Sequence, residues 1–82
     1  MTGYPCPCCS FLTRSRQEYG TYEICPVCSW EDDDYQFGYP DQDGGANDVS
    51  LNQAIKNFKE YGASDKLFLD KVRKPLSDEI PT

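Results

Sequence analysis

One short pattern occurs twice in the chain, as CPCCS at residues 6–10 and as CPVCS at residues 25–29. In each copy two cysteines lie three positions apart, and fifteen residues separate Cys9 from Cys25. This spacing, C-x2-C-x15-C-x2-C, is typical of sites in which four cysteines bind one zinc ion. Proline fixes φ at the start of each turn, so both thiolates of a pair can face the same ion. The predicted metal ligands are therefore Cys6, Cys9, Cys25 and Cys28.

Disulfides and iron are the two alternatives to zinc. A disulfide framework would leave an odd thiol, because the chain has five cysteines, and a reducing cytosol disfavours disulfides. Iron in a rubredoxin-like centre is the minor alternative, since four thiolates suit both metals. A site closed by four protein ligands has no free coordination position. The predicted cofactor is therefore one structural Zn²⁺.

Cys8 is the fifth cysteine and lies between the two predicted ligands of the first pair. The simpler interpretation is a spare thiol beside the metal site or in solvent. The other is an alternate ligand or a redox switch, because a thiol close to zinc can have a lowered pKa.

The composition limits the chain to one small domain with a thin core. It has 82 residues, of which 38% are hydrophobic, and a mean hydropathy of −0.72. A domain of this size usually needs a metal or disulfides for stability. Neither a membrane-spanning run nor a signal peptide is recognisable, so we expect a cytoplasmic protein. The absence of histidine excludes Ser-His and Cys-His nucleophile pairs.

The order of patterns predicts an α+β fold, in which a zinc-ribbon β-hairpin packs against two C-terminal helices. Residues 1–30 form the ribbon, with β-favouring runs at 11–13 and 22–24 expected to be its strands. Residues 31–50 are expected to be an acidic loop, residues 51–75 the helices, and residues 76–82 an extended tail.

Two helices are predicted after residue 50. Apolar residues recur at helical spacing from Leu51 to Tyr61, between Ser50 as N-cap in a capping box and Gly62 as the terminating glycine. The second helix begins after Ser64 or Asp65 and stops before a proline. Its side chains expected to face inward are Leu67, Phe68 and Val72.

The acidic segment holds the whole charge imbalance of the chain. Residues 31–50 contain seven acidic residues and no Lys or Arg, whereas the chain as a whole has a net charge of −6. No EF-hand register fits this segment. It is either a solvated loop or a surface that binds a basic partner, and aromatic residues among its acids favour binding. Trp30 is expected in the core, and the predicted partner-binding residues are Asp32, Asp33, Asp34, Tyr35 and Tyr39.

The sequence argues against two further classes of function, catalysis and nucleic-acid binding. No nucleophile–base pair or phosphate-binding glycine loop accompanies the acids, so we do not expect an enzyme. Nucleic acid is also a poor ligand for so acidic a chain, because phosphate binding needs a basic footprint. A protein with a basic surface is the expected partner.

Longer stretches of sequence resemble a known family. The run CPCC at residues 6–9, YEICPVC at 22–28 and WEDD at 30–33, followed by GGAN at 44–47, resembles the small bacterial cysteine-rich CPCC family. The resemblance implies a metal-binding domain without an established activity. Family members also look like the small genes found beside secreted toxins, which implies an immunity protein. Ser10 departs from the pattern, where glycine is expected.

The predicted function is a zinc-stabilised, non-catalytic protein-binding module, in its sharpest form an immunity protein against a basic bacterial toxin. The alternative is a metal- or redox-responsive protein that uses the free thiol of Cys8.

Overall fold

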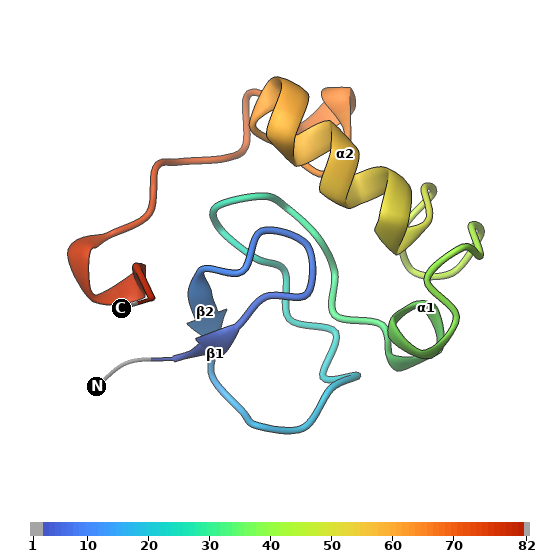
Figure 1. The fold of residues 1–82 in the computed structure, drawn as a ribbon, viewed down its shortest axis with the longest axis horizontal. Helices are drawn as coiled ribbons and strands as arrows, with labels where there is room; N and C mark the ends of the chain where they lie inside the picture. The colour runs from blue at the N-terminus through green and yellow to red at the C-terminus, as the bar shows by residue number, and fades with distance from the viewer. Residues whose placement is uncertain (1–2, 82) are drawn as a thin grey trace.

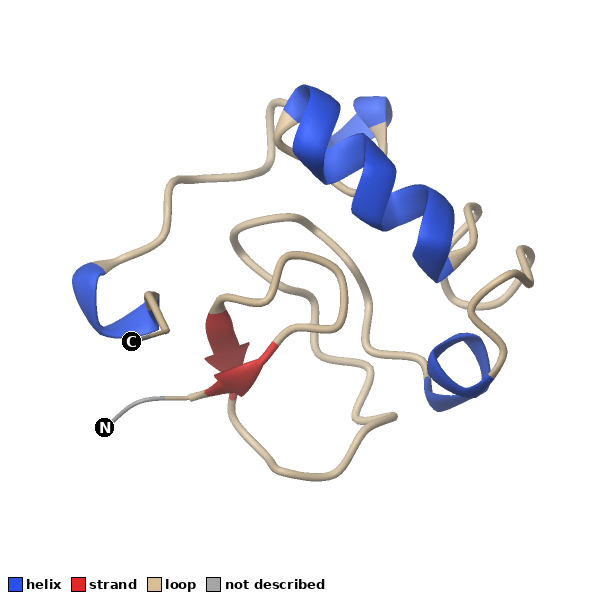
Figure 2. Ribbon diagram, viewed as in Figure 1, coloured by secondary structure: helices blue, strands red, loops and turns tan. Residues whose placement is uncertain are grey.

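The computed structural model describes residues 3–81 and confirms the predicted small α+β fold. Residues 1, 2 and 82, which belong to the predicted ribbon and tail, lie outside the described residues. Loops make up most of the N-terminal half, and α2 lies beside them (Figure 1). The helices follow the sheet along the chain (Figure 2). The elements are β1 (Tyr4–Pro5), β2 (Leu12–Arg14), α1 (Asp34–Gly38), α2 (Leu51–Tyr61) and the 3-10 helices η1 (Lys66–Phe68) and η2 (Ser77–Glu79).

The two strands enclose the first cysteine turn. β1 and β2 are antiparallel and pair Tyr4 with Arg14 and Pro5 with Leu12. The second cysteine turn is closed in a similar way by a bridge between Ile24 and Glu31. The prediction that residues 11–13 pair with residues 22–24 is therefore wrong. Each cysteine turn reverses the chain, so the segments on its two sides pair locally with each other.

The core forms around the cysteines. All five are buried, and Trp30 is 1% exposed, which confirms its predicted place in the core. Phe58 of α2 packs against this cluster and meets the ring of Phe11 edge to face. The metal-binding residues thus form the centre of the core, whose other buried apolar members are Val27, Leu51 and Ala54.

The loop after β2 is fixed by a buried arginine. Arg14 donates from Nε to the carbonyl oxygen of Pro5 and from Nη1 to that of Glu18, at 2.8 and 2.9 Å. Its guanidinium lies 4.0 Å from the centre of the Tyr19 ring. Tyr19 in turn stacks on Phe37 of α1, with the ring centres 3.8 Å apart. A segment without regular structure is in this way attached to α1.

The acidic segment is not the open loop that its composition predicts. It contains α1, and Asp33 caps this helix by accepting a hydrogen bond from the backbone N–H of Tyr35 at 2.8 Å. Gln36 is fully buried, and its side-chain amide donates to the carbonyl oxygens of Asn47 and Val49. Carboxylates that accept backbone hydrogen bonds need not repel one another, because each is compensated locally. The segment is therefore folded.

The first predicted helix is confirmed as α2. Ser50 is its N-cap and accepts from the backbone N–H of Gln53 at 3.1 Å. The helix ends at Gly62, whose φ of 90° is a left-handed conformation that glycine adopts without strain. Within residues 3–81 the backbone N–H of Ser50 does not donate to Gln53, so the second half of the expected capping box is not made, and the side-chain amide of Gln53 donates to Oδ1 of Asn57.

The second predicted helix is reduced to η1. Asp65 caps this single turn, as expected, but Leu67 is 71% exposed rather than turned inward. The backbone N–H of Arg73 donates to the carbonyl oxygen of Pro26, so the chain is drawn to the second cysteine turn rather than continuing as a helix.

The C-terminal segment is turned back instead of extended. Arg73 binds both carboxylate oxygens of Glu79, at 2.8 and 3.0 Å. The η2 turn that contains Glu79 lies against β2, and in Figure 1 the red end of the chain returns to the sheet. Within residues 3–81 no helix is long and apolar enough to cross a membrane.

Candidate metal centre

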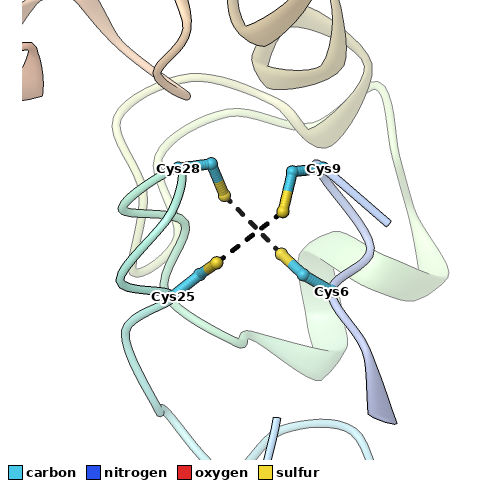
Figure 3. A group of neighbouring side chains, drawn as sticks. All are labelled: Cys6, Cys9, Cys25 and Cys28. Carbon is cyan, nitrogen blue, oxygen red and sulfur yellow. Dashed lines mark hydrogen bonds between the residues drawn. The ribbon is translucent and has the colours of Figure 1, made fainter. Parts of the chain in front are cut away.

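The predicted ligands come together in space. The Sγ atoms of Cys6, Cys9, Cys25 and Cys28 all lie within 4.8 Å of one another, and all four residues are buried. The sulfurs of Cys6 and Cys28 are 3.6 Å apart, and those of Cys9 and Cys25 are 3.7 Å apart. In Figure 3 these two contacts cross, as two opposite edges of a tetrahedron do when seen along the line that joins their midpoints.

These distances fit a tetrahedral metal site. Zinc binds thiolates at about 2.3 Å, and a regular tetrahedron with such bonds has sulfur–sulfur edges of about 3.8 Å. The observed 3.6 and 3.7 Å are close to this value. The four cysteines can therefore hold one metal ion with small adjustments of their side chains. Because all four positions come from the protein, such an ion would stabilise the fold and would have no open position for a substrate.

The two cysteine turns have the same backbone geometry. In the first turn the N–H of Ser10 donates to the carbonyl oxygen of Cys6, and in the second Ser29 donates to Cys25, both at 2.8 Å. Each serine adopts a left-handed conformation, with φ of 70° at Ser10 and 68° at Ser29. Glycine is the residue that adopts this conformation most easily, which explains physically why glycine is expected at position 10.

Two further groups donate to the sulfurs. The hydroxyl of Thr13 lies 3.1 Å from Sγ of Cys25, and the backbone N–H of Trp30 lies 3.4 Å from Sγ of Cys28. Hydrogen bonds of this kind reduce the negative charge on metal-bound thiolates and orient them. Thr13 could not be recognised from the sequence, because a threonine in a β-favouring run carries no signal of its own.

The four thiols change one another's pKa. Contacts with the sulfurs of Cys28 and then Cys6 lower the pKa of Cys25, and the Thr13 hydroxyl lowers it further. The contact with Cys25 raises the pKa of Cys28 and also that of Cys9. The protons are therefore shared unequally among touching sulfurs. All four thiols lose their protons together only when a cation compensates the accumulated negative charge.

Cys8 lies outside this group of four. Its side chain is 5% exposed and belongs to the same buried cluster as the ligands. Of the two positions expected for a spare thiol, beside the metal site or in solvent, the structure shows the first.

The predicted partner-binding residues divide into two sets. Asp32 and Asp33 are 2% and 6% exposed, so their predicted role at a binding surface is wrong. Asp32 accepts hydrogen bonds from the backbone N–H groups of Gly20 and Thr21, and Asp33 caps α1, so both carboxylates are used within the fold. The members of the set that are exposed are Asp34, Tyr35 and Tyr39.

Two matched cysteine turns that bring four buried sulfurs to one point define a small metal-binding domain. A family model described as Cysteine-rich CPCC matches residues 4–79, nearly the whole of the chain. The chain therefore belongs to the cysteine-rich CPCC family, as the sequence motifs predicted. None of the curated proteins matches it.

Proposed function

We propose that the metal is zinc and that its role is structural. Four thiolates bind zinc and iron alike, but zinc is the usual ion of closed four-cysteine sites in small ribbon-like domains. Elemental analysis of the purified protein should find one zinc per chain in a colourless sample. A red protein that contains iron would contradict this assignment.

The domain that the metal stabilises is, in this proposal, a non-catalytic protein-binding module of the bacterial cytoplasm. A metal ion held by four cysteines has no free position at which a substrate could be activated. The chain also has no histidine to serve as a general base at neutral pH. Binding through its surface is therefore better supported than catalysis.

The observation that carries the binding proposal is the surface of α1. Tyr35 and Tyr39 are 53% and 61% exposed, their ring centres are 5.0 Å apart, and Asp34 is exposed beside them. The buried side chain of Asp33 caps this helix, and the buried amide of Gln36 bonds it to Asn47, so the backbone that carries the tyrosines is fixed. Exposed tyrosines on a rigid element lose little conformational entropy on binding, which makes them suitable as interface hot spots. We call Asp34, Tyr35 and Tyr39 the α1 surface.

The charge around the α1 surface determines the class of partner. Further exposed carboxylates follow in the segment, at Asp41, Asp43 and Asp48, and residues 31–50 contain no Lys or Arg. A partner with a basic surface would be attracted at long range and would bind faster at low salt. A toxin that binds nucleic acid would have such a basic surface, because it must bind phosphates. An acidic protein can cover this phosphate-binding surface. The proposed role is immunity against such a toxin.

The test is a pull-down with the metal-loaded protein, followed by salt-dependent binding kinetics with the basic protein that it captures. A triple variant, Asp34→Asn with Tyr35→Ala and Tyr39→Ala, should lose the partner while keeping its metal. The control carries Glu60→Gln on α2 together with Leu67→Ala, two exposed positions away from α1, and should bind normally. Capture of the same protein by the triple variant, or the capture of nucleic acid alone, would contradict the proposal.

A second candidate function rests on the position of Cys8. Because this thiol is packed among the metal-binding cysteines, its oxidation could compete with metal binding. Reversible zinc release under mild peroxide, abolished by Cys8→Ser, would support a metal- or redox-responsive role. Equal release from both proteins would exclude a role for Cys8.

A further inference from the structure

Two buried polar atoms close to the metal centre have no hydrogen-bond partner among residues 3–81. They are Nε1 of Trp30 and Oδ1 of Asp32. The two residues are 1% and 2% exposed, so bulk solvent does not reach them freely. The other carboxylate oxygen of Asp32, by contrast, accepts three hydrogen bonds from Gly20 and Thr21. A buried polar atom without a partner costs free energy, so each of the two needs an explanation.

Both residues line the same small cavity. Its volume is about 10 Å³, and its wall also includes Thr13, Arg14 and Cys25. A cavity of roughly this size holds a single water molecule when polar groups surround it. It has no room for a metabolite or a hydrated ion.

The chemistry of the two atoms selects the ligand. The indole N–H of Trp30 can only donate, whereas a carboxylate oxygen of Asp32 can only accept. A cation would satisfy the carboxylate and leave the indole N–H unpaired, and an anion would do the reverse. Water both accepts and donates, so a molecule in the cavity that both residues line has the acceptor and the donor that the two atoms lack.

We propose that one bound water molecule is a constant part of the folded protein, accepting a hydrogen bond from Nε1 of Trp30 and donating one to Oδ1 of Asp32. The backbone N–H of Trp30 donates to Sγ of Cys28, and Asp32 holds Gly20 and Thr21. The water thus connects Trp30, whose backbone N–H donates to a metal-binding cysteine, with Asp32, which binds the loop before Tyr22.

Nuclear magnetic resonance of the metal-loaded, ¹⁵N-labelled protein tests this proposal without any substitution. Trp30 is the only tryptophan in the chain, so its indole N–H gives one unambiguous signal. We expect cross-relaxation between this proton and water, with the sign that distinguishes a bound molecule from hydrogen exchange. An indole signal without such cross-relaxation, or a crystal structure in which Nε1 bonds directly to a protein oxygen, would overturn the proposal.

Water ¹⁷O relaxation dispersion provides a second measurement. Trp30→Phe keeps an aromatic ring and removes the donor, and it should lose the contribution of one long-lived water molecule. Tyr61→Phe is the control, because it removes a polar hydrogen from an exposed ring that does not line the cavity, and it should match the wild type. Equal dispersion from the wild type and Trp30→Phe would overturn the proposal. If Trp30→Phe fails to fold, the indole measurement on the wild type decides.

Discussion

Ser10 and Ser29 occupy equivalent places in the two cysteine turns and share a left-handed backbone, with φ of 70° and 68°. A non-glycine residue in this conformation destabilises the folded state by about 1–2 kcal/mol. Glycine removes this strain, but it also makes the unfolded chain more flexible, and this flexibility offsets part of the gain. We therefore predict that Ser10→Gly or Ser29→Gly stabilises the metal-loaded protein by about 1 kcal/mol or less, measured by denaturant unfolding.

The matched control for these variants is Ser15→Gly. Ser15 is an exposed serine outside the set of residues with positive φ, so glycine there brings no relief of strain. A gain in stability from Ser15→Gly as large as that from Ser10→Gly would contradict the explanation.

Removal of the metal should unfold the domain. In small zinc-dependent peptides the ion contributes about 10–16 kcal/mol, and here the cysteines are the centre of the core. We expect a strong chelator to expose Trp30, which a red shift of its fluorescence would report. Cys6→Ser or Cys28→Ser should have the same effect without a chelator. Cys8→Ser is the internal control and should keep one metal per chain, whereas loss of the metal in this variant would overturn the ligand assignment.

The hydroxyl of Thr13 should tune the site through Cys25, from which it lies 3.1 Å. Thr13→Val keeps the shape of the side chain and removes the hydroxyl. We expect metal affinity to fall about 10-fold, as is typical for a lost partner of a metal ligand. Competition with a chromophoric chelator measures the change. Thr13→Ser should restore affinity, and a Val variant as tight as the wild type would show that the hydroxyl is unimportant.

Asp33 and Asp34 are neighbours in sequence with different roles. Asp33→Ala removes the cap of α1 and leaves the N–H of Ala46 without its acceptor at 2.8 Å, so it should cost about 2–3 kcal/mol. Asp34→Ala changes an exposed residue and should stay within about 0.5 kcal/mol of the wild type. Thermal and denaturant unfolding of the metal-loaded proteins provide the comparison. Equal losses of stability would show that Asp33 is not the cap that organises the segment.

The C-terminal turn should loosen in acid. The hydrogen bond from Arg73, together with one from the backbone N–H of Leu76, lowers the pKa of Glu79 in the folded state. A lowered folded pKa means that the pair stabilises the fold above the unfolded pKa of glutamate, about 4.3, and that this contribution is lost as the pH falls through the folded value. The protection of the η2 amides, measured as the exchange rate relative to that of an unfolded chain at the same pH, should therefore fall below about pH 4. Glu79→Gln should already lower this protection at neutral pH, and Asp78→Asn should not.

Much of the metal centre could be predicted from the sequence. Ligand identity depends on the C-x2-C spacing, which is a local property, and the four predicted cysteines are the four that meet. Helix α2 can be predicted from the sequence equally well, because Ser50, the apolar spacing and Gly62 are all local signals. The spacing also separates Cys8 from the two pairs, but it leaves open whether this thiol lies beside the site or in solvent, and only the fold decides that it is buried beside the site.

The errors arose where contacts are long-range. Periodicity finds strands at residues 11–13 but cannot say that the partner strand precedes the cysteine turn. A run of acidic residues predicts a solvent-exposed surface. Asp32 and Asp33 are nevertheless buried, and each accepts a hydrogen bond from a backbone N–H more than ten residues away. Leu67 was expected to face inward from local spacing, whereas the bond from Arg73 to Pro26 determines the path of that segment.

The sequence alone therefore determined the predicted metal ligands, the α+β class and the family, because each can be recognised from short patterns along the chain. The tertiary structure decided which acids are exposed, how the strands pair and where a cavity joins Trp30 to Asp32. Burial and pairing depend on which distant segments pack together. In this chain the four sulfurs bring the two cysteine turns to one centre, and the apolar residues of the core pack around it.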